Sequence, residues 1–176
     1  APFDNHCITC HNNNSGNFNG DVSISGLPSD IEPNTTYPIV LTMTPTAGTP
    51  IKGGFQLVMV NGNNGNAGDL APVNAQTGTE FFGGREYIEH RNGKFFSGGS
   101  VSWNFNWTSP TSAAGNTITA YFIGNFTNNN TGNDGDFPVD FSQSFNFTGA
   151  PPVTATIVDI TNVSCFGTNT GSATVE

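Results

Sequence analysis

Alternation of apolar and polar residues is the dominant pattern along most of this chain. The segment TYPIVLTMT, for example, puts Ile39, Leu41 and Met43 on one side and polar residues or Val40 on the other. A period of two is typical of a β-strand with one buried face. The same pattern recurs in DVSISGL, GGFQLVMV, SVSWNFNWTSP, NTITAYFIGNF and VDFSQSFNFTG. No segment has a helical period over about ten residues.

Turn-forming segments separate these candidate strands. NGNNGNAG, FFGG and NNNTGNDGDFP are rich in Gly and Asn, which adopt the conformations that tight turns need. Six or seven short strands without intervening helices predict an all-β fold, an antiparallel β-sandwich over residues 20–149. Met43 and Met59 lie on the apolar side of their strands and are expected in its core.

The two ends of the chain differ from this middle part. Residues 1–19 show no strand pattern and are predicted to form an N-terminal arm. Pro151 and Pro152 cannot extend a β-ladder, and a fresh apolar alternation follows them. Residues 150–176 are therefore predicted to be the truncated start of a second β module.

Charge excludes two classes of partner. The 176 residues include four basic and thirteen acidic side chains, a formal net charge of -9. Such a chain repels nucleic acid and anionic lipid. It also lacks the run of about 18 apolar residues that a membrane-spanning helix needs. Only 10% of residues are charged, and the sequence begins without Met; both features favour an exported protein whose signal peptide has been removed.

The densest chemistry lies near the N-terminus. Of three cysteines and three histidines in the chain, His6, Cys7, Cys10 and His11 lie together. Cys7, Cys10 and His11 form C-x-x-C-H, the attachment sequence of c-type haem. At this spacing two thiols can add to the vinyl groups of one porphyrin, and the adjacent imidazole becomes an axial iron ligand.

Other interpretations of the motif stay open. Cys7 and Cys10 could form a small disulfide in an exported protein. Zinc could be bound by Cys7, Cys10 and His11 with His6 or His90 as a fourth ligand, although no second ligand pair accompanies them. A redox dithiol normally opens a helix after a strand, and no helix is expected here.

A second axial ligand is expected to come from elsewhere in the chain. His6 adjoins the attachment cysteine and is poorly placed to reach the opposite haem face, whereas Met43 and Met59 are expected in the core. His90, in REYIEHRNGK, ends a strand-like segment just before a turn. Three of the four basic residues are near it in sequence, namely Arg85, Arg91 and Lys94. Such cations could neutralise two haem propionates.

The ordered segments resemble a known family. CITCHNN, GDVSISGLPSDIEPNTTYPIVLTM, GGFQLVMV, REYIEH, WNFNWTSP and GNTITAYFIGNFTNNNTGNDGD are together similar to the Reeler-like "choice-of-anchor V" domain of bacterial surface proteins, many from the Bacteroidota. The resemblance spans roughly residues 7–140. It implies an immunoglobulin-like sandwich and a haem held by Cys7 and Cys10 with His11 and His90 as axial ligands. It implies no reaction.

The tail VDITNVSCFGTNTGSATVE resembles the beginning of the SprB-type repeat of gliding adhesins from the same bacteria. Cys165 falls at the usual cysteine of that repeat, which implies a disulfide partner beyond residue 176. Proteins of this kind are typically exported by the type IX system to the cell surface. They fold first in the periplasm, where c-type haem is attached.

The leading hypothesis is a non-enzymatic, extracellular monohaem module for electron transfer. Two axial histidines leave no iron position for a substrate. Such a module needs a redox partner or a neighbouring haem protein, and a homo-oligomer or filament would put His6 near a contact. The alternative is a structural or adhesive surface module in which Cys7 and Cys10 form a disulfide or the haem is only a structural staple.

A calcium site is a weaker hypothesis. Asp134 and Asp136 in TGNDGDFP could supply loop carboxylates to Ca²⁺, but the segment matches no complete calcium-loop pattern. A solvated turn is the expectation for these two residues.

Overall fold

The computed structural model describes residues 11, 16–97, 99–130, 132–149, 157–161 and 172–175. Almost all regular structure in these residues is β-strand, interrupted by one 3-10 turn at Ala114–Asn116. Among the described residues no helix is long and apolar enough to cross a membrane. The strands are β1 Asn19–Ser25, β2 Asp30–Ile31, β3 Thr36–Ala47, β4 Lys52–Asn61, β5 Asp69–Pro72, β6 Thr77–Phe82, β7 Arg85–His90, β8 Lys94–Phe95, β9 Val101–Thr108, β10 Thr117–Thr127, β11 Phe137–Phe147, β12 Ile157–Thr161 and β13 Ser172–Val175.

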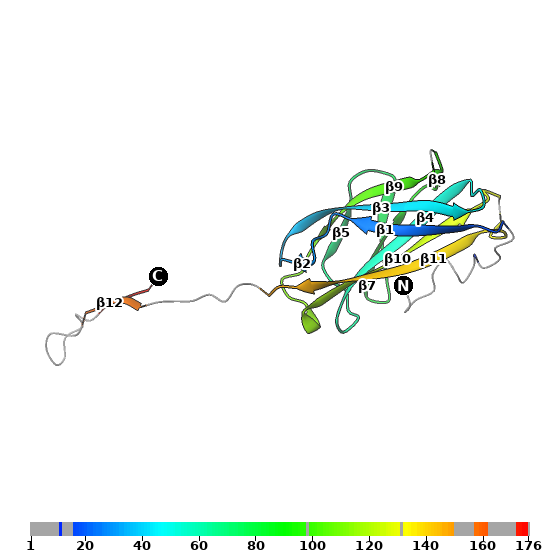
Figure 1. The fold of residues 1–176 in the computed structure, drawn as a ribbon. Coiled ribbons are helices and arrows are strands. Elements are labelled where there is room, and N and C mark those ends of the chain that lie inside the picture. The colour runs from blue at the N-terminus through cyan, green and yellow to red at the C-terminus, as the bar shows by residue number, and fades with distance from the viewer. Residues whose placement is uncertain are drawn as a thin grey trace.

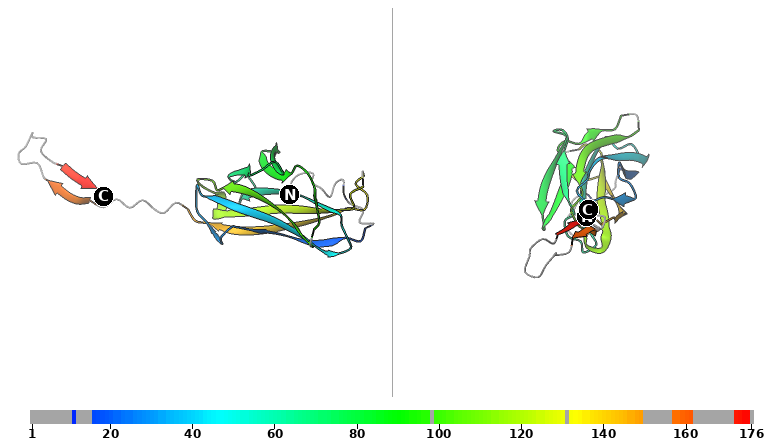
Figure 2. Two further views of the ribbon diagram at one scale, coloured as in Figure 1. Left: turned by 90° about the horizontal axis from the view of Figure 1, so that it is seen from above. Right: turned by 90° about the vertical axis from the view of Figure 1, so that its left-hand side faces the viewer.

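Strands β1 to β11 form a sandwich of two sheets (Figures 1 and 2). One sheet has the order β1-β3-β9-β5, and the other has the order β2-β11-β10-β4-β7-β6, with β8 also paired to β4. The predicted all-β sandwich is confirmed. Pairing is antiparallel throughout these sheets except between β2 and β11, which run parallel over two residue pairs.

The predicted alternation builds the core. Strand β9 turns Trp103, Phe105 and Trp107 inward, each at most 1% exposed. Strand β3, paired with β9, turns Ile39, Leu41 and Met43 to the same interior. Fully burying an aliphatic or aromatic side chain of this size contributes about 1.5–3 kcal/mol. Met43 and Met59 are 0% and 1% exposed, which confirms that both belong to the core.

More strands form than the six or seven that the alternation predicts. The additional ones are short or border the sheets: β2 and β8 have two residues each, and β5 has four. A two-residue strand has too few positions to show a period. The FFGG segment does form the predicted turn, because Gly83 and Gly84 both have positive φ and join β6 to β7 as a two-residue hairpin loop.

The C-terminal segments β12 and β13 pair antiparallel as a two-stranded sheet. Asp159, Ile160 and Thr161 in β12 are exposed. The division of the chain at residues 149 and 150 and the second β module stay predictions, and Cys165 lies outside the described residues.

Candidate functional site

Two histidines far apart in the sequence line one pocket of about 230 Å³. The described residues around it are His11, Lys52, Gly53, Gly54, His90, Gly93, Asn125 and Thr127. Its floor is a pair of adjacent strands: Gly54 of β4 lies opposite Asn125 of β10, and Lys52 lies opposite Thr127. Since Phe55 faces the core, Gly54 lies on the outer face of the seven-stranded sheet.

His11 is held by a buried carboxylate. Its Nδ1 lies 2.7 Å from Oδ2 of Asp136, a residue that is only 3% exposed. A carboxylate at this contact accepts, so Nδ1 of His11 is the donor. In the neutral imidazole the lone pair is then on Nε2, the nitrogen that remains for a metal.

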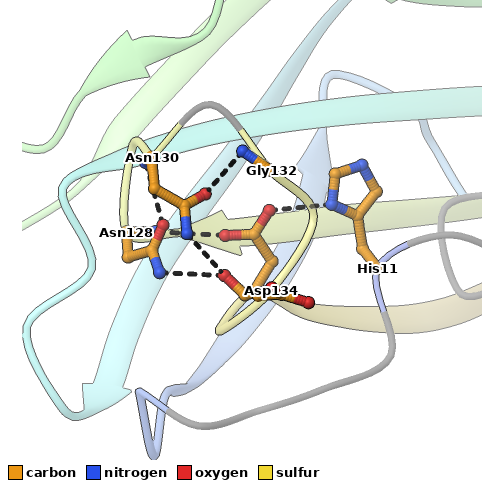
Figure 3. Close-up of polar contacts among 6 residues, drawn as sticks. His11, Asn128, Asn130, Gly132 and Asp134 are labelled. Atoms are coloured by element: carbon orange, nitrogen blue, oxygen red, sulfur yellow. Dashed lines mark hydrogen bonds and ion pairs between the residues drawn. The ribbon is translucent and has the colours of Figure 1, made fainter.

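Hydrogen bonds join Asn128, Asn130 and Asp134 in the loop before β11 (Figure 3). The backbone N–H of Asn128 donates to Oδ1 of Asp136 over 3.1 Å. The amides of Asn128 and Asn130 both donate to the backbone carbonyl of Asp134, at 2.9 and 3.1 Å. The Asn130 N–H donates in turn to Oδ1 of Asn128 at 2.9 Å, as in an Asx-turn. Asp136 is thus a buried hydrogen-bonding residue, and the expectation of a solvated side chain was wrong for it, although Asp134 is exposed.

His90 is the last residue of β7, as expected. Its imidazole, and not a further backbone pair of β7, contacts the backbone of β4 at Phe55. The ladder between β4 and β7 stops at Gln56 and Glu89, one position before Phe55. Nδ1 of His90 lies 3.0 Å from both the nitrogen and the oxygen of the Phe55 backbone. One tautomer accepts from the Phe55 N–H, and the other donates to its carbonyl. Only the second leaves the Nε2 lone pair for a metal.

Gly54 makes room for His90. A β-carbon on Gly54 would lie 2.5 Å from Cε1 and 2.6 Å from Nε2 of His90, closer than real atoms approach. The imidazole therefore lies directly against the backbone of β4. The imidazole also lies near the rings of Phe55 and Trp103, with ring centroids 6.4 and 6.5 Å away and ring planes inclined by 42° and 58°.

The basic residues predicted to surround His90 have other partners. Arg91 forms ion pairs with Glu80 at 2.8 Å and Glu89 at 3.2 Å. Arg85 is at the opposite end of β7, where its Nε donates to the carbonyl of Asn64 at 2.8 Å. Arg85 is thus separated from His90 by the full length of β7, although it is near His90 in sequence.

Lys94 is likewise engaged. Its Nζ donates to the carbonyl of Ser102 at 2.5 Å and lies 5.2 Å from the Trp103 ring centroid. Burial lowers the pKa of Lys94. As propionate partners, Arg91 and Lys94 would have to leave these contacts, and that part of the prediction stays untested.

Lys52, to which the sequence analysis gave no role, is the cation among the described residues lining the pocket. Its Nζ lies 4.4 Å from the ring centroid of Phe95, a residue that is 61% exposed. Asn125 was missed as well. It is 6% exposed, and its Oδ1 has no hydrogen-bond partner among the described residues, which leaves an acceptor at the pocket floor.

The remaining predicted site residues, His6, Cys7 and Cys10, lie outside the described part of the chain. Within the described ranges, no three His, Cys, Asp or Glu side chains come together as a candidate metal site. Calcium binding by Asp134 and Asp136 stays untested.

The residues of the pocket fit a c-type haem in their donor chemistry. One imidazole directly follows the second attachment cysteine, the other reaches the same pocket, and each has Nδ1 near a partner. The volume of about 230 Å³ is below the ~300–1,000 Å³ of pockets that enclose most of a ligand. A porphyrin here would therefore keep much of its surface outside the pocket.

No protein-family model matches the chain, and no curated protein matches it. Similar solved structures include AvmM, which catalyses macrocyclization in alchivemycin A biosynthesis, at 12% identity and a TM-score of 0.49, covering 77% of this chain and 92% of that one. They also include the reelin-N domain of F-spondin, at 12% identity and a TM-score of 0.48, with coverages of 81% and 95%. The human F-spondin reeler domain is 13% identical with a TM-score of 0.44, and the coverages are 72% and 88%. At such identities and scores, the fold assignment depends on the strand pairing.

Proposed function

We propose that this chain is a c-type monohaem electron-transfer module, with Cys7 and Cys10 as the thioether attachment sites and His11 and His90 as axial ligands. The observation that carries the proposal is that His11 and His90, which are far apart in the sequence, line one pocket. When bound, the haem supplies a one-electron Fe(III)/Fe(II) couple.

The chain's own residues have distinct tasks in this proposal. His11 and His90 bind through Nε2, and Asp136 and the Phe55 carbonyl orient their rings through Nδ1. Gly54 keeps the space for His90, and Lys52 puts a positive charge at the pocket. Because His11 and His90 would both hold the iron, no position would be left for a substrate, and we propose that the module is not an enzyme.

A shallow pocket favours electron exchange between the haem and a neighbouring protein. A haem that is enclosed only in part has an edge that a partner can approach closely. The partner class we propose is a redox protein or a neighbouring haem module, including another copy of this chain. His6, next to Cys7, would lie near such a contact.

We further propose that the chain is exported and acts at the cell surface, as a member of the Reeler-like choice-of-anchor V group followed by a SprB-type repeat. The C-x-x-C-H motif, the ordered segments and the low fraction of charged residues, 10%, support this placement. Detection of the protein by surface proteolysis of intact cells tests it. A protein that is protected unless the cells are lysed would contradict it.

The intact mass of the purified native protein tests haem attachment. The proposal expects an increase of about 616 Da over the chain mass, mapped to the peptide containing Cys7 and Cys10. A loss of about two daltons would indicate a disulfide, and hence the structural or adhesive module. A zinc adduct that disappears on chelation would indicate the metal site.

A further inference from the structure

Asp136 is a buried carboxylate that contacts His11, one of the residues lining the pocket. It is 3% exposed, and both oxygens are engaged: Oδ2 with Nδ1 of His11 at 2.7 Å, and Oδ1 with the N–H of Asn128 at 3.1 Å. No interaction with Lys or Arg is found for it among the described residues. Oδ2 of Asp136 accepts its hydrogen bond from the imidazole of His11.

The position of Asp136 is set by the sandwich and not by the N-terminal arm. It directly precedes β11, which pairs along its length with β10. The loop between these strands is closed by the hydrogen bonds of Asn128 and Asn130 to the carbonyl of Asp134. The carboxylate therefore presents a fixed acceptor to which His11 is oriented.

The two histidines have unequal partners. Nδ1 of His11 faces a carboxylate, whereas Nδ1 of His90 faces an uncharged peptide group. Hydrogen bonds to a charged acceptor are roughly twice as strong as neutral ones. A carboxylate that draws on the Nδ1 proton makes Nε2 a more basic ligand, which favours the more highly charged oxidation state of a metal.

We infer that Asp136 is a positioning residue for His11: it selects the tautomer with a free Nε2, orients the ring and lowers the reduction potential of the bound iron. This inference rests on the proposed function, because it concerns the same axial ligand. Of the two proposed ligands, His11 would then have the larger effect on the reduction potential.

The test replaces the carboxylate by an amide of the same shape in the haem-loaded protein. Asp136→Asn is expected to raise the midpoint potential, so that the ratio of oxidised to reduced protein at a fixed potential falls by about an order of magnitude. Asp134→Asn is the matched control. It removes one negative charge from the same loop, but the side chain of Asp134 is exposed, and the hydrogen bonds from Asn128 and Asn130 go to its backbone carbonyl.

An unchanged potential in Asp136→Asn, or an equal shift in both variants, would overturn the inference. A second measurement needs no variant: in the reduced, diamagnetic wild type, the Nδ1 proton of His11 should give a downfield, slowly exchanging NMR signal. Absence of that signal would overturn the inference even if Asp136→Asn fails to fold. Absence of haem from the wild type is a different result, and it refutes the proposed function itself.

Discussion

Gly54 and His90 are in direct contact, and a larger residue at position 54 would require the imidazole to move. A β-carbon there would lie 2.5 Å from Cε1 of the imidazole. The same ring, through Nδ1, lies 3.0 Å from the Phe55 backbone. The imidazole of His90 thus contacts the β4 backbone beyond the last β4–β7 pair, and it also lines the pocket.

Gly54→Ala is expected to displace His90. Overpacking of this kind costs about 1–3 kcal/mol of unfolding free energy, and the displaced ring would lose its place as an iron ligand. Denaturant unfolding and the absorption spectrum measure the two effects. Gly149→Ala is the control, since a β-carbon at Gly149 would meet no atom within 4 Å. Equal behaviour of the two variants would contradict the contact.

His90→Ala separates a redox ligand from a structural staple. Loss of the ring leaves the Phe55 backbone without its Nδ1 partner, and an unsatisfied buried group costs about 1–3 kcal/mol. If His90 also ligates iron, the spectrum changes from six-coordinate low-spin to five-coordinate high-spin. A lower melting temperature with an unchanged spectrum would make His90 a capping residue only.

Lys52→Met tests the charge at the pocket. Removing a cation close to the iron favours the oxidised state, so we expect the midpoint potential to fall. Arg85→Met is the matched control, because Arg85 is at the far end of β7 from His90. The expected difference also shrinks as ionic strength rises. A larger shift in Arg85→Met than in Lys52→Met would contradict the role of Lys52.

Lys94 predicts a pH dependence of stability. Burial lowers the pKa of Lys94 from 10.5, so between the lowered value and 10.5 the unfolded chain binds more protons than the folded one. Stability from this group therefore rises with pH across that window. Unfolding of wild type and Lys94→Gln, compared at about pH 7 and about pH 10, should show the wild type gaining relative to the variant. A relative loss at the higher pH would refute the sign.

The fold was predictable where a strand has one buried face. Trp103, Phe105 and Trp107 alternate with polar residues in the sequence and form one wall of the core. The two-residue strands β2 and β8 were not predictable, because they are too short to show an alternation. In β4, Val58 and Val60 are buried as well as Leu57 and Met59, because the two valines form a second cluster with Tyr87 and Tyr121.

The site was predictable only in its two histidines. His11 was found through the cysteine spacing and His90 through its strand end, but their partners come from tertiary contacts. Asp136 lies 125 positions from His11, and nothing local to either residue signals the pair. The basic residues near His90 in sequence gave no sign of their partners, such as the ion pairs of Arg91 with Glu80 and Glu89. Adjacent glycines, Gly53 and Gly54, were the one available sign of a close approach to the backbone.

The absorption spectrum of the purified wild-type protein, recorded oxidised and then reduced, tests the central claim most directly. Ligation by both His11 and His90 predicts a Soret band and a low-spin spectrum in both states, with the sharp visible bands of a six-coordinate low-spin c-type haem in the reduced state. A protein without a Soret band would contradict haem binding. A five-coordinate high-spin spectrum in the wild type would contradict the pairing of His11 with His90.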